Sequence, residues 1–182
     1  MKRLLSIVLG CVIFMSSLVN ANNLDNILYL YLKDGRVAIE MRPDLAPKHV
    51  ARIKELVREK FYDGLTFHRV IDGFMVQTGD PLGNGTGGSG QKIPAEFSKE
   101  PHVKGTVSMA RSNDPNSGDS QFFICLANAR FLDNQYTVWG QVIEGMEYVD
   151  KIKKGDPQNN GSVNNPDKII RMTMAEDEVQ PK

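Results

Sequence analysis

The sequence has few of the residues on which disulfide, metal and redox sites depend. It contains two cysteines, Cys11 and Cys125, and three histidines, His49, His68 and His102. Two cysteines are too few for a disulfide-rich scaffold. The histidines form no closely spaced pair with each other or with a cysteine, as a zinc site would require. We therefore expect no metal site.

The chain also lacks an excess of charge of either sign. Its 22 Lys and Arg residues balance 22 Asp and Glu residues, so the formal net charge is +0. Nucleic-acid-binding domains usually carry a clear basic excess, so we expect no nucleic-acid partner. A hydrophobic content of 41% in 182 residues is typical of one soluble globular domain. The 16 glycines and 9 prolines indicate many turns and favour β structure.

Long apolar runs are absent except at the N-terminus. The basic start Met1–Arg3 precedes an apolar run, Leu4–Met15, and Val19 and Ala21 then stand three residues and one residue before a possible cleavage point. This is the layout of a secretory signal peptide. The run is short for a membrane-spanning helix, which needs about 20 residues. We interpret residues 1–21 as a cleavable signal peptide.

Cleavage after Ala21 would leave residues 22–182 as the mature domain, with no membrane association. Two alternatives stay open, namely an uncleaved anchor and a lipid attached to Cys11 within a loose lipobox. In the mature chain Cys125 would be the lone cysteine. Because it lies in the apolar segment Phe122–Leu126, we interpret it as a buried core thiol.

Periodicity in residues 22–182 predicts a mainly β fold with two helices. Helical spacing of apolar residues occurs over His49–Phe61 and Glu144–Lys153, and Glu176–Lys182 is a short charged tail. Many short strands with isolated helices fit a closed or nearly closed β-barrel with helical caps. Eight segments have strand character: Ile27–Leu32, Arg36–Met41, Leu65–Ile71, Phe74–Thr78, Gly105–Ala110, Gln121–Leu126, Thr137–Val142 and Lys168–Met174.

Two motifs suggest functions that their context does not support. Gly85–Gly90 satisfies the Gly-x-Gly-x-x-Gly dinucleotide pattern, but Pro94 follows and no helical period begins. We interpret it as a flexible surface loop. A Ser-His-Asp hydrolase is compatible with the composition, but the chain contains no Gly-x-Ser-x-Gly elbow. An unrelated hydrolase or binding barrel stays open as an alternative.

The segment Phe67–Asp80 is unusual because Arg69 interrupts an apolar run. Arginine is rarely buried without a partner, so this position needs an explanation. In a later strand Gln121 and Phe123 lie on the same face. From spacing alone, Phe123 and its apolar neighbours could be ordinary core and Arg69 a surface ion-pair donor. Alternatively, these residues form a polar and apolar binding groove.

Taken together, several segments resemble the cyclophilin family of peptidyl-prolyl isomerases. The resemblance extends over nearly all of Asn26–Ala175 and implies a closed eight-stranded antiparallel β-barrel capped by two α-helices. With the N-terminal signal, the chain is most similar to periplasmic members from Gram-negative bacteria. The segments that carry the resemblance are Phe67–Asp80, Asn84–Gly88, Val107–Ala110, Asp119–Cys125 and Phe131–Asp133.

The resemblance implies a role for each residue of the site. Arg69 matches the catalytic arginine. Phe131 and Tyr136 stand where the best-known eukaryotic members carry Trp and His, so we expect cyclosporin A to bind only weakly. The positions that match the substrate-binding residues are Phe74, Met75, Gln77, Ala110, Arg111, Gln121, Phe123, Phe131, Leu132 and Tyr136.

The implied activity is rotation about X–Pro peptide bonds in unfolded or partly folded exported proteins. No covalent bond breaks in this reaction, so we expect neither a metal nor a cofactor. We expect a periplasmic location and a monomer. The alternative function is a non-catalytic chaperone or adaptor barrel that binds proline-containing segments.

Overall fold

The structure, a computed structural model, describes residues 21–179. The signal peptide predicted at residues 1–21 lies, apart from Ala21, outside the described residues, and it stays a prediction. The described part opens with a 3-10 helix, η1 (Ala21–Asn26). No helix in this part of the chain is both long and apolar enough to cross a membrane.

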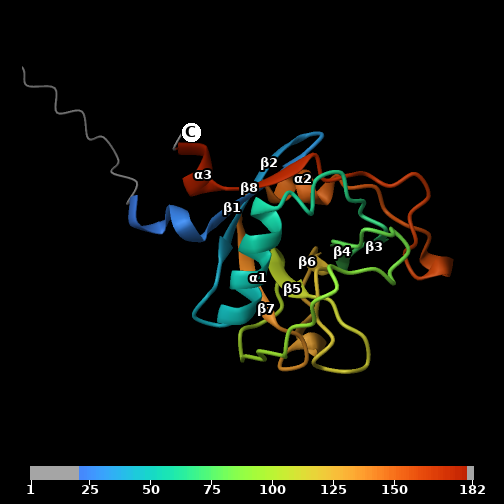
Figure 1. Ribbon diagram of the computed structural model, residues 1–182. Helices are drawn as coiled ribbons and strands as arrows, with labels where there is room; N and C mark the ends of the chain where they lie inside the picture. The colour runs from blue at the N-terminus through green and yellow to red at the C-terminus, as the bar shows by residue number, and fades with distance from the viewer. Residues whose placement is uncertain (1–20, 180–182) are drawn as a thin grey trace, which may run out of the picture.

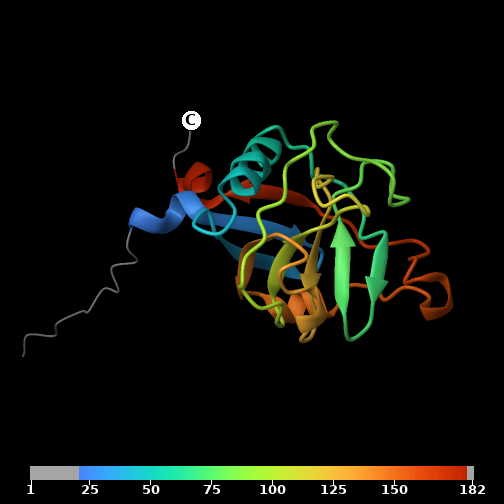
Figure 2. The same ribbon diagram turned by 90° about the horizontal axis from the view of Figure 1, so that it is seen from below.

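Eight antiparallel strands form one strongly curled sheet, with helices outside it (Figures 1 and 2). The order of hydrogen-bonded neighbours is β3-β4-β6-β5-β7-β2-β1-β8. The mainly β architecture with eight strands confirms the prediction. The strands are β1 (Ile27–Leu32), β2 (Gly35–Met41), β3 (Arg69–Ile71), β4 (Met75–Thr78), β5 (Thr106–Met109), β6 (Phe122–Cys125), β7 (Val138–Glu144) and β8 (Arg171–Met174).

The predicted closure of the barrel is not confirmed. The strands β3 and β8 are the two ends of the strand order, and no regular ladder joins them. Irregular segments meet there instead: Phe67 N–H donates to Asp167 O at 2.9 Å, and Ile169 N–H donates to Leu65 O at 2.8 Å. Pro166 cannot donate to a ladder, and Asn165 has a positive φ of 51° that interrupts extended backbone. The result is a half-barrel that is open along this side.

The sheet is buried on both faces around β6. Phe122 and Ile124 point into the main core, whereas Phe123 and Cys125 point to the other face. In the core Phe122 packs edge-to-face against Trp139, with ring centroids 5.4 Å apart. Cys125 is fully buried, as predicted, and burial raises the pKa of its thiol to about 12.

The first α-helix, α1 (Pro47–Arg58), begins two residues before the predicted segment His49–Phe61, with Pro47 in its first turn, and packs against β8. Its buried side chains recur at helical spacing, among them Val50, Ile53 and Val57. The preceding Ala46 offers no side-chain cap. The carboxylate of Glu96 replaces one, because it accepts hydrogen bonds from the backbone N–H groups of Lys48 at 3.1 Å and His49 at 3.0 Å.

The two remaining helices differ from the prediction. The predicted helix Glu144–Lys153 is shortened to α2 (Met146–Asp150), because β7 continues to Glu144 and Gly145 adopts a left-handed conformation. The segment expected to be only a charged tail contains a third helix, α3 (Ala175–Val179). Arg58 of α1 forms ion pairs with Glu176 and Asp177 of α3. The described residues therefore carry three α-helices, not two.

Candidate active site

The outer face of β4 and β6 carries a second apolar cluster, separate from the barrel core. Its buried members are Met75, Phe123, Cys125, Ala129 and Leu132. Strand pairing creates the cluster, because Met75 lies opposite Cys125 and Gln77 lies opposite Phe123. Alternate residues of each strand therefore project to the same outer face.

A cavity of about 260 Å³ opens above this cluster. It contains the predicted catalytic arginine and nine of the ten predicted substrate-binding residues. The tenth, Gln121, lines the adjoining cavity. The sequence prediction thus names residues that the fold does bring together, although they come from four separate segments. The lining residues are Arg69, Phe74, Met75, Gln77, Ala110, Arg111, Phe123, Phe131, Leu132 and Tyr136.

The apolar wall of the cavity is built from aromatic contacts. Phe123 is 5% exposed and meets Tyr136 edge-to-face, with ring centroids 5.8 Å apart. Phe74 and Phe131 pack against each other at 5.4 Å on the rim, where Phe131 is 65% exposed. A large exposed apolar side chain beside a cavity is typical of a binding surface.

The polar wall is formed by Arg69, whose guanidinium is held from two sides. Its Nη1 donates to Gln77 Oε1 at 3.1 Å, across the β3–β4 pair. Its Nε and Nη2 donate to the backbone and side-chain oxygens of Asn160 at 3.0 and 2.9 Å. Within residues 21–179 no carboxylate lies within ion-pair distance of Arg69, so the alternative of a surface ion pair is wrong.

Burial lowers the pKa of Arg69 from its ordinary value. The group nevertheless stays charged at neutral pH, because an arginine starts from a value above 12. A cation without a bound anion in a half-buried site can therefore direct its unused N–H donors at a ligand.

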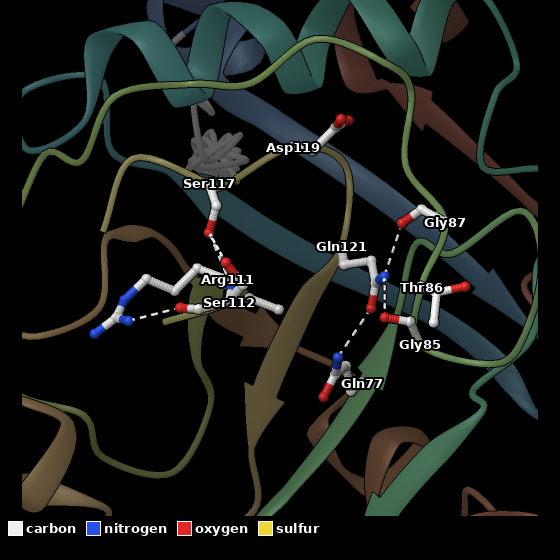
Figure 3. Close-up of a pocket in the computed structure, with 10 residues that line it drawn as sticks. Gln77, Gly85, Thr86, Gly87, Arg111, Ser112, Ser117, Asp119 and Gln121 are labelled. Atoms are coloured by element: carbon white, nitrogen blue, oxygen red, sulfur yellow. Dashed lines mark hydrogen bonds between the residues drawn. The ribbon is translucent and has the colours of Figure 1, made fainter. Parts of the chain in front are cut away.

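The hydrogen-bond chain continues from Arg69 through two glutamines. Gln77 Nε2 donates to Gln121 Oε1 at 3.0 Å, and Gln121 Nε2 donates to the carbonyls of Gly85 at 3.1 Å and Gly87 at 2.8 Å (Figure 3). Gln121 thus joins the arginine to the glycine-rich loop. This chain fixes the side-chain orientations before any ligand binds.

Arg111 occupies the boundary between the two cavities. Its Nε and Nη2 donate to Gln135 O at 3.1 and 3.0 Å. Its Nη1 donates to Ser112 O at 2.8 Å (Figure 3). The guanidinium carbon lies 4.5 Å from the centre of the Tyr136 ring. The side chain therefore locks the loop that follows Ala110 against the aromatic wall.

Sequence reasoning missed Asn160. It lies just after the short helix η3 (Pro157–Asn159), in a segment interpreted only as polar and turn-rich. Asn160 has a φ of 50° and precedes Gly161, which has a φ of 77°. Asn-Gly is a turn signal in the sequence. Nothing local, however, predicts that this turn reaches an arginine 91 positions away.

The interpretation of Gly85–Gly90 as a flexible surface loop missed its role in the site. Asp80 accepts hydrogen bonds from the backbone N–H groups of Leu82, Asn84 and Gly85. The loop so anchored forms one wall of an adjoining cavity of about 220 Å³, whose other walls include Arg111, Ser117 and Gln121 (Figure 3). The sequence did contain a signal for an ordered loop here, because Asp80 is followed within four residues by Gly83 and Asn84. This combination is typical of a loop in which a side chain bonds the nearby backbone.

Comparison with known proteins agrees with this geometry. Residues 27–174 match the model of the family described as "Cyclophilin type peptidyl-prolyl cis-trans isomerase/CLD". The chain belongs to this family. It is 59% identical over 165 residues to a probable peptidyl-prolyl cis-trans isomerase of Brucella suis, and the match covers 84% of each chain. The protein is therefore a cyclophilin-type peptidyl-prolyl cis-trans isomerase.

Solved cyclophilins share the fold. The cyclophilin AquaCyp293 from Hirschia baltica matches with a TM-score of 0.75 and 30% identity, covering 85% of this chain and 75% of that one. A cyclophilin-type isomerase of Cryptosporidium parvum, crystallised in the presence of the dipeptide Ala-Pro, matches with a TM-score of 0.74 and 25% identity. That match covers 81% of this chain and 98% of the other.

Proposed function

We propose that this isomerase assists the folding of exported proteins in the periplasm, as a monomer that acts on X–Pro bonds. The isomerase activity follows from the family. The N-terminal layout of Met1–Ala21 supports the location. Because uncatalysed X–Pro exchange takes tens to hundreds of seconds, it can limit folding.

Catalysis here requires only that the site bind the twisted amide better than either planar isomer. The barrier of about 18–20 kcal/mol arises because twisting removes the resonance of the amide. As resonance is lost, the lone pair of the prolyl nitrogen becomes able to accept a hydrogen bond. A donor aimed at this nitrogen therefore stabilises the transition state more than the ground state.

The observation that carries the proposed mechanism is the double anchoring of Arg69 beside an apolar cavity. Three of its five N–H donors are occupied by Asn160 and Gln77, and two remain available. We assign the donation to the prolyl nitrogen to one of these two. Since Asn160 and Gln77 hold the guanidinium in place, little reorganisation is needed when the amide twists.

The rest of the cavity suits a proline ring and its neighbouring chain. Met75, Phe123 and Leu132 present buried apolar surface that a pyrrolidine ring can cover. Gln77, Gln121 and the backbone around Arg111 then offer polar groups for the flanking peptide. The Ala-Pro dipeptide used with the Cryptosporidium parvum relative supports proline-containing peptides as ligands.

The folding role is tested with the fragment 22–182 and a periplasmic protein whose refolding is limited by an X–Pro bond. We expect the fragment to speed the slow refolding phase at substoichiometric concentration. Acceleration that appears only at stoichiometric amounts would favour the non-catalytic chaperone alternative. Fractionation of cells that produce the full chain tests the periplasmic location, and activity confined to the cytoplasm would overturn it.

A further inference from the structure

The guanidinium of Arg111 lies at the groove, yet the proposed mechanism uses only the backbone around this residue. Its carbon lies 4.5 Å from the centre of the Tyr136 ring and 6.0 Å from the centre of the Phe97 ring. A cation within about 6 Å of an aromatic face is attracted to it. In Figure 3 the side chain extends away from Gln121 and the glycine-rich loop. Arg111, Tyr136 and Phe97 thus form a cluster beside the groove, which we call the arginine clamp.

The same guanidinium joins two loops by hydrogen bonds. It donates through Nε and Nη2 to Gln135 O, and through Nη1 to Ser112 O. Because Gln135 directly precedes Tyr136, these bonds hold the backbone from which the tyrosine ring projects. A planar guanidinium can reach the carbonyls of both loops at once, whereas the ammonium of a lysine is a point charge.

Tyr136 carries this constraint into the cavity of about 260 Å³ beside Arg69. Tyr136 lines that cavity, and its ring meets Phe123 edge-to-face at a centroid distance of 5.8 Å. The hydroxyl of Tyr136 makes no hydrogen bond within residues 21–179. The position of the ring therefore depends on its packing against Phe123 and Arg111.

Phe97 gives the arginine clamp a member outside the groove. It is 41% exposed and lines neither the cavity beside Arg69 nor the adjoining cavity of about 220 Å³. Its link to the groove is the guanidinium of Arg111. A substitution of Phe97 can therefore change peptide binding through Arg111 without removing a contact to the peptide.

We propose that Arg111 is a positioning residue, whose side chain holds the Tyr136 ring as a preformed wall for the peptide. The inference rests on the proposed binding of the X–Pro segment in the cavity beside Arg69. A wall that contacts the peptide equally in its planar and twisted states contributes uniform binding. Loss of such a wall raises KM and leaves kcat nearly unchanged, whereas loss of the Arg69 donor lowers kcat.

The experiment measures kcat and KM separately for an uncharged Ala-Pro peptide. It uses the fragment 22–182, which contains all of the described fold except Ala21. Arg111→Met keeps an unbranched side chain and removes every donor, and we expect it to raise KM at least about fourfold with kcat within twofold. Arg111→Lys keeps the charge without the planar guanidinium, and we expect a similar rise. A wild-type KM for Arg111→Lys would mean that charge alone acts, and would overturn the inference.

Two further variants test whether the effect passes through the arginine clamp. We expect Phe97→Ala to raise KM at least about twofold, although Phe97 lines neither cavity. In a Tyr136→Leu background the positioned ring is gone, so Arg111→Met should change KM less than twofold. Independent, additive effects of the two substitutions would overturn the inference.

Arg36→Met is the matched control. Arg36 also lies over a tyrosine, 4.1 Å from the centre of the Tyr29 ring, but it lines neither cavity. We expect Arg36→Met to leave kcat and KM within 1.5-fold of the wild type. A rise in KM as large as that of Arg111→Met would indicate an effect of net charge, and would overturn the inference.

Urea unfolding of each variant separates positioning from stability. Loss of folded protein lowers the apparent kcat and leaves KM unchanged, so a fall in kcat alone for Arg111→Met would also overturn the inference. Failure of the wild type on the Ala-Pro peptide would instead overturn the isomerase function itself.

Discussion

At the scale of single residues, the site is organised by one cation whose partners are all neutral. Arg69 contacts the amide and carbonyl groups of Gln77 and Asn160 and no carboxylate within residues 21–179. A carboxylate partner would neutralise the field that the twisted amide needs. Neutral anchors fix the geometry and leave the charge available.

We expect Arg69→Ala to lower kcat/KM at least about a hundredfold, roughly 2.7 kcal/mol of transition-state stabilisation. The fold should persist, because the guanidinium lies outside the barrel core. We also expect Arg69→Lys to be poor, since an ammonium cannot reach Gln77 and Asn160 together as a planar fork does. A protease-coupled peptide assay measures both, with circular dichroism as the control for folding. Near-normal activity of a folded alanine variant would contradict the mechanism.

We expect the activity on an uncharged peptide to be nearly flat between about pH 6 and 8 and insensitive to chelators. Burial, as the largest cause, lowers the pKa of His68 and of His102 from the ordinary value of 6.5, so their titration is shifted toward the acidic side of this range. The reaction breaks no bond and uses no Lewis acid. Rates measured across this range, with and without EDTA, provide the check. A bell-shaped profile would reveal a titrating group in the site.

We expect Phe131→Trp to tighten the binding of cyclosporin A by roughly tenfold. The resemblance places Phe131 where drug-sensitive relatives carry tryptophan, and phenylalanine lacks the indole N–H. One added hydrogen bond contributes about 0.5–1.5 kcal/mol. The side chain is 65% exposed on the rim, so the larger ring has room. Isothermal titration calorimetry of both proteins measures the change, and nanomolar affinity of the wild type would show that this position does not limit the drug.

At the scale of elements, the strands were predictable and the short helices were not. All eight strands lie within or beside the segments chosen from alternation and turn residues, because one face of each is buried. The helix α3 spans only Ala175–Val179, too short for a periodic signal. It is held by side chains distant in sequence, such as Arg58 and Tyr31, which donates to Glu178. Contacts of this kind are invisible to a local pattern.

In the site, too, the residues on strands were predictable and those on loops were less so. The strand residues of the groove were predictable from the resemblance, since strand pairing repeats a fixed alternation. The contacts of Asn160 with Arg69 and of Gly87 with Gln121 were not predicted, because loops reach the groove only through tertiary contacts. The prediction of a closed barrel is not confirmed for a related reason. The irregular segments between β3 and β8 are shaped by Asn165 and Pro166, not by alternation.

We expect Glu96→Gln to destabilise the fold by about 1–2 kcal/mol at pH 7. Glu96 accepts from the first backbone N–H groups of α1, and from His49 Nδ1 at 2.7 Å. Desolvation raises the pKa of Glu96, but these hydrogen bonds outweigh it, so the pKa is lowered from 4.5. A lowered pKa means that the stabilisation is present above about pH 4.5 and is lost as the pH falls below it.

Urea unfolding of both proteins measures this difference. The gap between wild type and Glu96→Gln should narrow when the pH is lowered from 7 toward 3.5. Glu59→Gln, at the exposed C-terminal end of the same helix, is the matched control and should change stability little. Equal stability of Glu96→Gln and wild type at pH 7 would show that the helix start needs no carboxylate.

At the scale of the whole molecule, we expect export and cleavage after Ala21. The layout of Met1–Ala21 motivates this expectation. Mass spectrometry of the protein recovered from cells measures the N-terminal residue, and we expect Asn22. A lipid-bearing start at Cys11, or an intact Met1, would contradict a freely diffusing periplasmic enzyme. Exchange of Ala21 for a bulky residue should block cleavage and serves as the control.

The two ends of the described chain come together at one side of the barrel. The opening helix η1 packs against α3, whereas β3 and β4, which carry Arg69 and Gln77, lie at the opposite side (Figures 1 and 2). A tether, a purification tag or a fused domain attached at either end would therefore leave the groove unobstructed. The same proximity makes the chain a good subject for circular permutation, with a short linker from α3 to η1 and new ends in an exposed turn.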